Sequence, residues 1–557
     1  MALITRPRPD SAPPAAEPPV RRSRPRWRRI ASDLLTAGAF LLVMAILTAP
    51  NRIERLTPGE FVRIPVEGVL AAALLLGVPA RARRPVAAVI GLALGIVGVL
   101  KIVDMAFIAL VARSFDPVLD WSLLPVAVET LKETFGRAGA YGLATLAVSA
   151  AIGVPLLTML AVLRLSRLGV RHRDATTRGT IVLAVVWVVC AAMSVQLVPG
   201  APFASRTVAG LTYYRMVAMR KSLADERAFA AQARQDPFRN VPSDKLLTGL
   251  RGKNVIVAFV ESYGRDAVQN PLYATQVGAV LADADGRLRA KGFASRSAFL
   301  TSPVYGGGSW MAHATLQSGL RVDNQQRFRT LVSSERLTLA QAFRSAEWRT
   351  VAVTPASVRA WPEASYFGFG DVYDSRNLGY RGPRFGYAAM PDQFTLEALR
   401  RRTAGGRPFM AEVDLVSSHT PWAPVPRMVG WDELGDGSVF GPIAAAGATP
   451  DEVWRDADRI RTEYRRSIEY SLTSLLSYVE RYGDADTVVV FLGDHQPASP
   501  VVAADASRDV PVTVLARDPA VLSRVAGWGW RDGLRPAPDA PVWPMADFRD
   551  RFLTAFA

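Results

Sequence analysis

The sequence predicts a chain of two parts: an N-terminal domain of about five transmembrane helices and an external α/β domain with a largely parallel central sheet. Three observations predict this fold class. Half of the 557 residues are hydrophobic, and the long apolar stretches all lie within the first 200 residues. After residue 253, short β-branched runs alternate with helical patterns, as in sheets covered on both faces. The loops that join the apolar stretches alternate between strongly and weakly basic.

Five apolar stretches are close to the ~20 residues that a helix needs to cross a bilayer, and the second is the shortest. The first could be mistaken for a signal peptide, but no small-residue cleavage pattern follows "LLVMAILTAPNRIERL", and further apolar stretches come after it. We therefore interpret it as a retained membrane anchor. The stretches lie at about 30–49, 64–80, 86–112, 139–163 and 179–199.

The net charge of +16 follows membrane topology, which argues against nucleic acid as a partner. Residues 1–200 contain 23 Lys and Arg but 12 Asp and Glu. Eight arginines precede the first stretch, "RARR" separates the second from the third, and five arginines separate the fourth from the fifth. The alternate loops are less basic, so the positive-inside rule predicts a cytoplasmic N-terminus and an external location for everything after residue 200.

Changes in composition divide the chain into four segments. Residues 1–29 are rich in proline and arginine and are predicted to be a disordered, basic cytoplasmic tail. Residues 30–199 form the predicted transmembrane domain. Residues 200–252 are polar and basic and read as a connector. Residues 253–557 are predicted to be the external α/β domain.

Two charged residues of the third apolar stretch and a cysteine of the fifth are of interest. Lys101 and Asp104 are three residues apart on one helical face, so we expect a structural ion pair, with a role in lipid or substrate handling as the alternative. Cys190, the single cysteine, lies in the fifth stretch. The external domain therefore has neither a disulfide nor a zinc cluster built from thiolates.

Chemically useful side chains follow three of the predicted buried strands. "NVIVAFVE" ends in Glu261, "TVVVFLGD" ends in Asp494 and is followed by His495, and "FMAEVDLV" leads through two serines to His419. In parallel α/β sheets, ligands bind beyond the carboxyl ends of the strands. We therefore expect these residues to meet at one edge, although each acid taken alone could simply cap a helix. The other predicted elements are the strands "RTVAVT" and "VPVTVLA" and the helices "RLTLAQAFRSAEW" and "DEVWRDADRIRTEYRRSIEYSLTSLLSYVERYG".

Three glycines precede Ser309 in "GGGSWMAHATLQSGL". One interpretation is a flexible surface loop. The other is a tight turn that presents Ser309 as a nucleophile at a helix N-terminus, where amide donors and the helix dipole favour an anion.

Glu261, Asp494 and His495 offer two carboxylates and one imidazole. This donor set suits manganese, zinc or magnesium better than copper or iron. A divalent ion beside Ser309 would lower the pKa of its hydroxyl and could bind a phosphoryl or sulfuryl oxygen.

These motifs resemble those of the alkaline phosphatase and sulfatase superfamily, in particular its membrane-anchored lipoteichoic acid synthase and phosphoglycerol transferase branch. The motifs that carry the resemblance are "NVIVAFVESYG", "GGGSWMAHATLQSGL", "SSHTPW" and "FLGDHQP", in the order of that family. The resemblance implies a sulfatase-like fold for the external domain and a multi-pass protein of a bacterial-type inner membrane, with the catalytic domain outside the cytoplasm.

The resemblance also implies roles for particular residues. It implies one divalent metal ion, Mn²⁺ in the first place and Mg²⁺ or Zn²⁺ as alternatives, and makes Ser309 the nucleophile and His419 a catalytic group on the substrate side. It implies a phospholipid donor and a glycan or polymer acceptor. The implied metal ligands are Glu261, Ser309, Asp494 and His495, and the implied substrate-binding residues are Trp361, Arg359 and His313.

The sequence departs from the pattern of that branch at three positions. Serine stands where the branch uses threonine as nucleophile, the acidic residue expected shortly after it is missing, with His313 nearby instead, and Thr354 stands where a histidine is expected. No C/S-x-P-x-R motif surrounds Ser309, so a formylglycine is not expected. Two alternatives remain open: a sulfatase-like hydrolase or phosphodiesterase that uses water as acceptor, and a catalytically inactive membrane scaffold.

Overall fold

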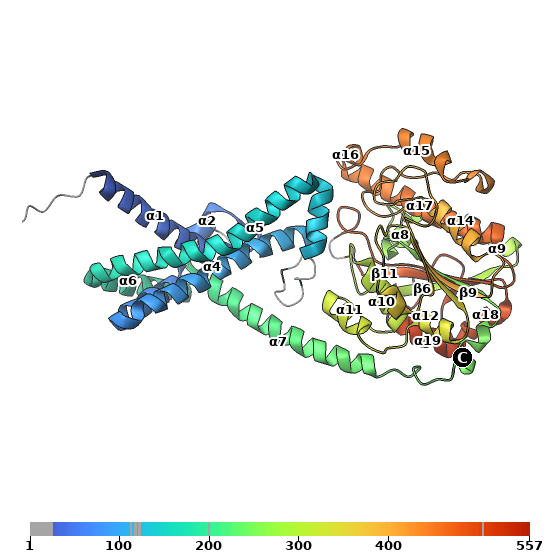
Figure 1. Ribbon diagram of the computed structural model, residues 1–557, viewed down its shortest axis with the longest axis horizontal. Helices are drawn as coiled ribbons and strands as arrows, with labels where there is room; N and C mark the ends of the chain where they lie inside the picture. Colours follow the sequence, from blue (N-terminus) through green and yellow to red (C-terminus); the bar gives the residue numbers. More distant parts are fainter. Residues whose placement is uncertain (1–25, 112–113, 116–119, 121–123, 199–200, 504–505) are drawn as a thin grey trace, which may run out of the picture. The chain divides into compact units, whose positions relative to one another are not determined.

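The computed structural model describes residues 26–111, 114–115, 120, 124–198, 201–503 and 506–557. Most of the predicted disordered tail at 1–29 lies outside the described residues. The chain forms two compact units, Met1–Lys221 and Ser222–Ala557, whose helices and strands are labelled in Figure 1.

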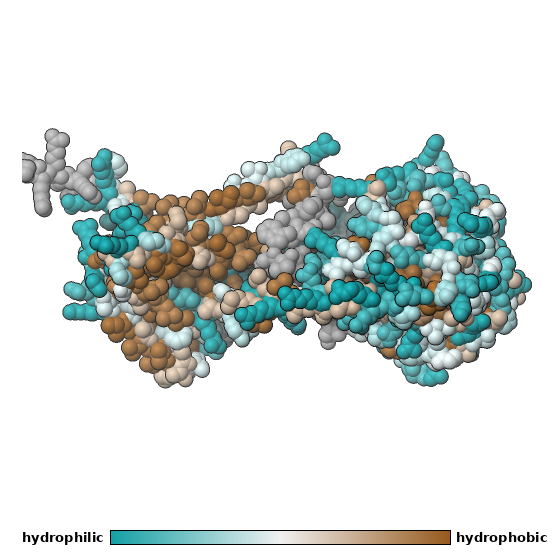
Figure 2. Space-filling view, turned by 60° about the horizontal axis from the view of Figure 1, so that its bottom comes forward, coloured by the Kyte–Doolittle hydropathy of each residue, from teal (hydrophilic) through white to brown (hydrophobic). Residues whose placement is uncertain are grey.

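The first unit is a bundle of apolar helices. Four of them are long and apolar enough to cross a membrane, over Trp27–Thr48, Ala80–Ile108, Gly136–Arg171 and Arg173–Ala192. A shorter apolar helix, α3, corresponds to the shortest predicted stretch. Hydrophobic residues cover much of the visible face of this unit, whereas hydrophilic residues predominate on that of the second (Figure 2). The elements are α1 (Arg26–Thr48), α2 (Pro58–Phe61), β1 (Ile64–Pro65), α3 (Val66–Gly77), α4 (Ala80–Val111), α5 (Leu124–Arg171), α6 (Arg173–Ala192), β2 (Gln196–Val198), β3 (Ala201–Pro202), β4 (Ala204–Ser205) and α7 (Thr207–Arg234).

Although α3 is short, it runs back across the bundle. The Lys101 ammonium on α4 donates hydrogen bonds of 2.7 Å to the carbonyl oxygens of Ile46 and Ala49, so the C-terminal part of α4 lies beside the end of α1. The chain must therefore return between these two helices. Strand β1, just before α3, pairs with β4 beyond the end of α6, while Arg173 at the start of α6 donates to the Leu76 oxygen at the end of α3. Helix α3 is thus antiparallel to α6, although its 12 residues make it shorter than the four helices that are long enough to cross a membrane.

Lys101 and Asp104 do not form the ion pair that their spacing suggested. Lys101 holds the C-terminal carbonyls of α1, and Asp104 forms an ion pair with Arg215 of α7. The two side chains lie on the same helical face but extend toward different neighbouring elements. A spacing of three residues does not tell whether two such side chains contact each other or other elements.

Two glycines allow α4 and α5 to approach closely. A Cβ on Gly95 would lie 2.4 Å from the Pro155 Cα, and one on Gly91 would lie 2.6 Å from the Met159 Cα. Small residues four apart are the usual means of bringing membrane helices into backbone contact. This contact fixes the position of α5 against α4.

We expect Gly95→Ala to destabilise the first unit by about 1–3 kcal/mol, because the added methyl group forces two helix backbones apart. Thermal unfolding of the detergent-solubilised protein measures this effect. Gly153→Ala in α5 is the matched control, because its added Cβ meets no atom within 4 Å. The control should be neutral or slightly stabilising, since alanine is the better helix former. Equal unfolding temperatures for the two variants would contradict the close approach.

The second unit is built on a nine-stranded sheet, of which five consecutive strands are parallel, so the sheet is largely parallel as predicted. The strand order is β12-β6-β11-β10-β5-β9-β7-β8, with β13 pairing β6. Strands β10, β5, β9, β7 and β8 run parallel, whereas β11 is antiparallel to both β10 and β6. The bounds are β5 (Asn254–Val260), β6 (Ala294–Thr301), β7 (Arg349–Thr354), β8 (Asp371–Asp374), β9 (Phe409–Leu415), β10 (Thr487–Gly493), β11 (Asp509–Ala516), β12 (Arg531–Asp532) and β13 (Val542–Pro544).

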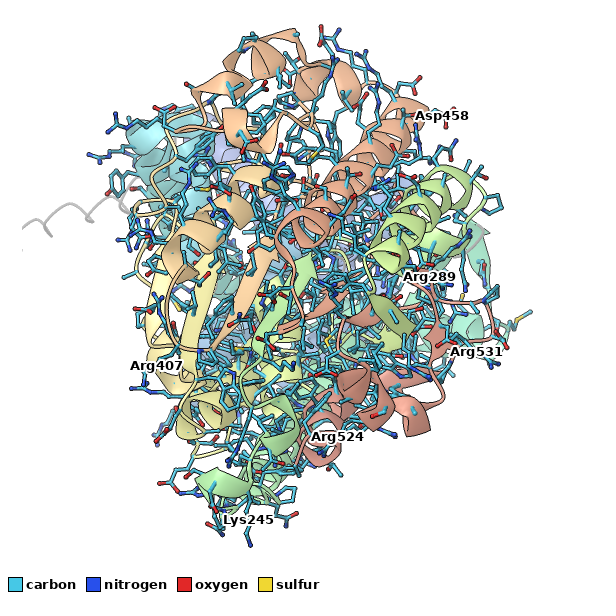
Figure 3. The ribbon with its side chains drawn as sticks, turned by 90° about the vertical axis from the view of Figure 1, so that its right-hand side faces the viewer. Lys245, Arg289, Arg407, Asp458, Arg524 and Arg531 are labelled. Carbon is cyan, nitrogen blue, oxygen red and sulfur yellow. The ribbon has the colours of Figure 1, made fainter. Side chains whose placement is uncertain are left out.

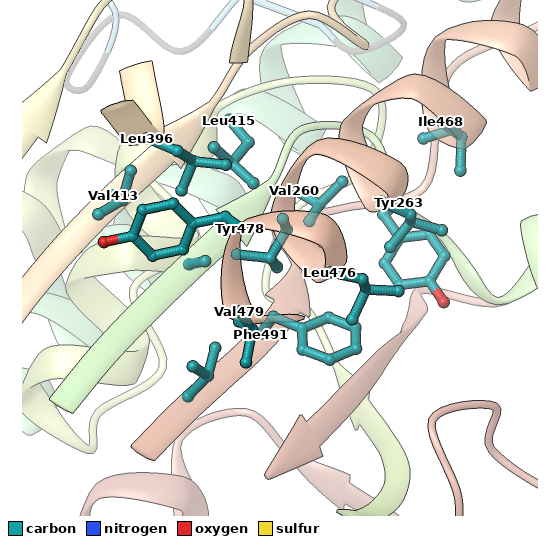
Figure 4. Close-up of a cluster of buried hydrophobic side chains, with 14 of the residues drawn as sticks. Val260, Tyr263, Leu396, Val413, Leu415, Ile468, Leu476, Tyr478, Val479 and Phe491 are labelled. Carbon is teal, nitrogen blue, oxygen red and sulfur yellow. The ribbon is translucent and has the colours of Figure 1, made fainter. Parts of the chain in front are cut away.

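Helices cover both faces of this sheet, and the alternation of residues along each strand decides which face a side chain joins. Val260 and Phe491 belong to the core on one face, where they lie near Leu476 and Val479 of α17 (Figure 4). Phe259 belongs to the core on the other face, which includes residues of α10, α12 and α19. The helices are α8 (Arg265–Gln269), α9 (Ala274–Ala290), α10 (Ser309–Ser318), α11 (Gln325–Val332), α12 (Leu339–Ser345), α13 (Ala364–Phe367), α14 (Asp392–Thr403), α15 (Gly441–Ala446), α16 (Pro450–Val453), α17 (Ala457–Tyr482), α18 (Pro519–Arg524) and α19 (Asp547–Ala555).

Charged side chains cover the outside of the second unit. Arg289, Arg407 and Arg531 are exposed and extend from its surface in Figure 3. The buried polar groups of this unit are described next.

Candidate active site

Two adjacent parallel strands bring Glu261 and Asp494 together. Val260 of β5 is paired with Gly493 of β10, so each acid follows the same rung of the sheet. Because side chains alternate along a strand, Glu261 and Asp494 lie on the same side of the sheet as Phe259 and Leu492. This is the side covered by α10. His495 Nε2 lies 3.3 Å from Glu261 Oε1 and 3.4 Å from Asp494 Oδ2, and all three side chains are buried.

Ser309 is the first residue of α10 and points at this cluster. Its Oγ donates to Glu261 Oε2 at 3.2 Å and lies 3.4 Å from His495 Nε2. Gly306, Gly307 and Gly308 have φ angles of 68°, 145° and 85°, a region that side chains rarely adopt. The Gly306 amide donates to the Gln496 carbonyl at 2.9 Å, which joins the turn to the segment after His495. The glycine run therefore forms a tight, anchored turn.

A side chain at Gly307 should impair catalysis more than folding. A Cβ there meets no atom within 4 Å, so the change introduces no clash, but the φ of 145° is unfavourable for alanine. We expect Gly307→Ala to lower stability by about 1 kcal/mol or somewhat more and turnover by more than about tenfold, because the turn must relax and shift Ser309. Gly286→Ala in α9, where the added Cβ is also free of contacts, is the control. Turnover and unfolding temperature are measured together, and unchanged turnover would contradict the role of the turn.

The neighbouring backbone orients the cluster for a cation. The amides of Ser262 and His495 both donate to Asp494 Oδ1 at 2.8 Å. His495 Nδ1 donates to the Gln496 carbonyl at 2.9 Å, so the neutral ring presents the lone pair of Nε2 to Glu261 and Asp494. Metal-bound histidines usually donate their second nitrogen in this way. Two carboxylates, one oriented imidazole and a serine oxygen therefore fit a divalent cation.

The pKa values show how strongly these groups interact. Burial raises the pKa of Glu261, but the charge of His495 outweighs it and lowers that pKa overall. Burial and the charge of Glu261 raise the pKa of Asp494 to about 6. Burial opposes the charge on His495, but the two carboxylates raise its pKa to about 9. In the protein without metal, a proton on His495 therefore balances part of the acidic charge, and a divalent cation would compete with it.

His419 follows β9 in a well-supported loop. Its Nδ1 donates to the Thr420 carbonyl at 2.6 Å, so Nε2 is the nitrogen available to a substrate. Its ring stacks on Tyr387 at 3.7 Å between centroids. The preceding Ser418 hydroxyl donates to the Glu261 carbonyl at 2.6 Å, which ties this loop to the end of β5. The charge of His419 is also among the causes that lower the pKa of Glu261.

A buried acid holds the His419 loop from the other side. The Ser417 amide donates to Asp392 Oδ1 at 3.0 Å, and the Ser471 hydroxyl of α17 donates to Asp392 Oδ2 at 2.6 Å. Burial raises the pKa of Asp392 to about 6, although the hydrogen bonds that its carboxylate accepts lower that pKa in part.

His313 joins a second polar cluster instead of the first. It lies one turn after Ser309 on α10 and stacks on Phe259 at 3.7 Å between ring centroids. Its Nδ1 lies 2.9 Å from Glu412 Oε1 and 3.6 Å from Asp414 Oδ1. Burial would lower the pKa of His313, but these two acids raise it to about 9, so the ring carries a positive charge at neutral pH.

Glu412 and Asp414 were missed in the sequence, although "FMAEVDLV" contains the signal. Acids two residues apart in a buried strand must face the same side and need a partner there. The register pairs Asp414 with Phe259, two residues before Glu261. Strand spacing then places the second cluster about 8 Å from the first.

The other predicted substrate residues lie on the loop after β7, at the same edge of the sheet. Trp361 packs against Phe367 and Phe369 at 5.6 and 5.8 Å between ring centroids, which gives it a clear packing role. Arg359 is exposed. Thr354, where a histidine is expected, ends β7, and its buried hydroxyl has no hydrogen-bond partner among the described residues.

Ser302 is a poor alternative nucleophile. It is fully buried, and its hydroxyl donates to the Asp494 carbonyl at 2.6 Å. Thr301 donates to Asp509. Their hydroxyl groups are therefore engaged in the scaffold.

Known proteins were compared with this chain. Solved structures to which it is similar include the lipoteichoic acid synthase LtaP from Listeria monocytogenes (14% identity, 55% of this chain and 72% of that chain covered, TM-score 0.36). They also include the phosphoglycerol transferase GacH from Streptococcus pyogenes, in complex with sn-glycerol-1-phosphate (13% identity, 59% of this chain and 91% of that chain covered, TM-score 0.34). A third is the lipooligosaccharide phosphoethanolamine transferase EptA, an integral membrane protein from Neisseria meningitidis (11% identity, 94% of this chain and 95% of that chain covered, TM-score 0.43). No curated protein matches the sequence.

The comparison with protein families identifies the second unit. Residues 253–508 match the family model described as Sulfatase. This range contains Ser309, His419 and every acid and histidine of both clusters. The chain therefore carries a sulfatase-family domain of the alkaline phosphatase superfamily, and this domain follows the apolar helices in the sequence.

Proposed function

We propose that the protein is a membrane-bound, metal-dependent phosphotransferase that moves a phosphoglycerol-like head group from a phospholipid to a cell-envelope glycan or polymer. The observation that carries the proposal is the position of the Ser309 hydroxyl, which lies 3.2 Å from Glu261 and 3.4 Å from His495 at the start of a helix. A hydroxyl held against a buried cation-binding cluster is suited to attack phosphorus.

Glu261, Ser309, Asp494 and His495 would hold the cation, for which we propose Mn²⁺, with Mg²⁺ or Zn²⁺ as alternatives. When bound, a divalent cation lowers the pKa of a neighbouring hydroxyl and neutralises charge that develops on a phosphoryl group. The superfamily to which this domain belongs is metal-dependent, which supports the assignment.

The reaction has two displacement steps. First, the Ser309 oxygen bonds to phosphorus, its proton passes to water, and the bond from phosphorus to the diacylglycerol oxygen breaks. His419 gives the departing oxygen a proton from Nε2. Second, an acceptor hydroxyl attacks the same phosphorus and loses its proton to His419, the bond from phosphorus to the Ser309 oxygen breaks, and that oxygen takes up a proton from water.

Three residues are proposed to bind the head group. His313 supplies a fixed positive charge one helical turn from Ser309. Trp361 and Arg359 lie on the loop after β7, at the edge of the sheet where the clusters lie.

The test is mass spectrometry of the products, and of the Ser309 peptide, after purified protein is incubated with labelled phosphatidylglycerol and Mn²⁺. The proposal expects diacylglycerol release, a phosphoglycerol group on Ser309, and transfer of that group to an added glycan. Release of glycerol phosphate to water without transfer would identify a hydrolase. A complete lack of products and of modified Ser309 would favour an inactive scaffold.

We propose an inner-membrane location with the N-terminus inside and the catalytic domain outside. Within the first unit, Arg164 donates to the Ser32 oxygen, and Arg173 to the Leu76 oxygen, so two of the basic segments lie at one end of the bundle. Reporter fusions at residues 55, 82, 125, 172 and 220 should alternate in accessibility, beginning outside. If positions 172 and 220 report the same side, the orientation is wrong.

A further inference from the structure

The first unit contains a cavity of about 650 Å³ whose chemistry the proposed reaction does not use. It lies where the last turn of α6, the β2–β3 hairpin and the first turns of α7 meet. Lys101, which holds the end of α1, also lines it. The cavity therefore lies at one end of the apolar bundle.

Every charged residue among the described residues that line this cavity is basic: Arg63, Lys101 and Arg206. Two of them are held in place. Arg63 donates to the Thr48 carbonyl at 2.6 Å and pairs with Glu60, and Lys101 binds the last carbonyls of α1. Arg206 is exposed, and its guanidinium has no ion pair or hydrogen-bond partner among the described residues. Glu60 offsets the charge of Arg63, so the Lys101 ammonium and the free Arg206 guanidinium are the groups that suit an anion, and guanidinium groups bind phosphate through paired donors.

The rest of the wall is amphipathic. Trp187 and Tyr214 line the cavity together with the apolar Val195 and Leu211. The Trp187 indole donates to the Ser205 carbonyl at 3.1 Å, which fixes its ring. Aromatic rings of this kind sit at the boundary between head groups and acyl chains. A purely soluble anion would make no use of the apolar part of the wall.

We propose that this cavity binds the phosphate-bearing head group of an anionic membrane phospholipid, with its acyl chains extending along the apolar helices. The volume is within the range of small-molecule sites, about 300–1,000 Å³. The further step, that this lipid is the donor for transfer, rests on the proposed function. The binding itself does not require turnover.

The chain carries a built-in probe for the test, because its single cysteine, Cys190, lines the cavity and is partly exposed. Full-length Ser309→Ala protein in detergent is titrated with phosphatidylglycerol, phosphatidylcholine or soluble glycerol phosphate. The rate at which a maleimide modifies Cys190 is then measured. We expect phosphatidylglycerol to slow labelling at least about threefold, and the other two to have little effect.

Two arginine variants on the Ser309→Ala background locate the effect. Arg206→Gln should abolish the protection, whereas Arg220→Gln, an exposed arginine further along α7 that does not line the cavity, should keep it. Gly210→Leu should slow labelling without lipid, because its side chain would enter the cavity from a position with no atom within 4 Å.

Three results would overturn the inference: equal protection by phosphatidylcholine, protection by glycerol phosphate alone, or full protection in the Arg206→Gln protein. If Cys190 is not protected but wild-type protein still transfers head groups, the cavity is wrong and the proposed function stands. If Cys190 is protected but no transfer occurs, the cavity stands and the proposed function fails.

Discussion

Ser309→Ala should abolish formation of the covalent intermediate and lower turnover by about 10⁴-fold or more, the scale seen when a nucleophile is removed. The physical reason is that neighbouring hydroxyl groups already donate hydrogen bonds: Ser262 to Glu261, Ser302 to the Asp494 carbonyl and Thr301 to Asp509. The fold should persist, because the Ser309 hydroxyl contributes no core packing. The measurements are product formation and mass analysis of the Ser309 peptide, with unfolding temperature recorded beside them.

Ser309→Thr is the informative companion variant. It keeps the hydroxyl and adds one methyl group, as in the branch that this domain resembles. We expect measurable turnover and a phosphorylated threonine. Full activity of Ser309→Ala together with a phosphorylated species elsewhere would show that the turn of three glycines presents something other than the nucleophile.

Asp494→Asn should remove divalent-cation binding while leaving the local hydrogen bonds in place. Asparagine can still accept from the Ser262 and His495 amides, but it loses the negative charge that the cation requires. In the wild type, cation at 100 times its Kd should stabilise the fold by about 2.7 kcal/mol, because only the folded protein binds it. The variant should lose this stabilisation and more than about 100-fold of its activity.

Thermal unfolding with and without Mn²⁺ measures the effect, and chelation should make the wild type behave like the variant. Glu412→Gln is the matched control, because it removes a buried carboxylate from the second cluster. It should keep the Mn²⁺ response. If Glu412→Gln loses the response and Asp494→Asn keeps it, the cation belongs beside His313.

Much of the candidate site followed from the sequence alone. The β-branched runs before Glu261 and Asp494 predicted parallel strands, and parallel strands deliver their final residues to one edge of a sheet. The glycine run before Ser309 predicted either a loose loop or a tight turn, and only the φ angles and the Gly306 hydrogen bond distinguish them. Strand β6 was not predicted from the sequence, because the first half of "ASRSAFLT" is polar and lacks the apolar run of the other strands.

The sequence by itself determined the apolar helices, the family that the second unit matches and the acids that end its strands, because these depend on hydrophobicity and local order along the chain. Only the tertiary structure decided which groups meet. Tertiary contacts placed His313 on Glu412 and gave Lys101 and Asp104 separate partners. They also formed the basic cavity around Arg206. The physical reason is that partners such as His313 and Glu412, 99 residues apart, are chosen by strand register and helix packing, which no local pattern encodes.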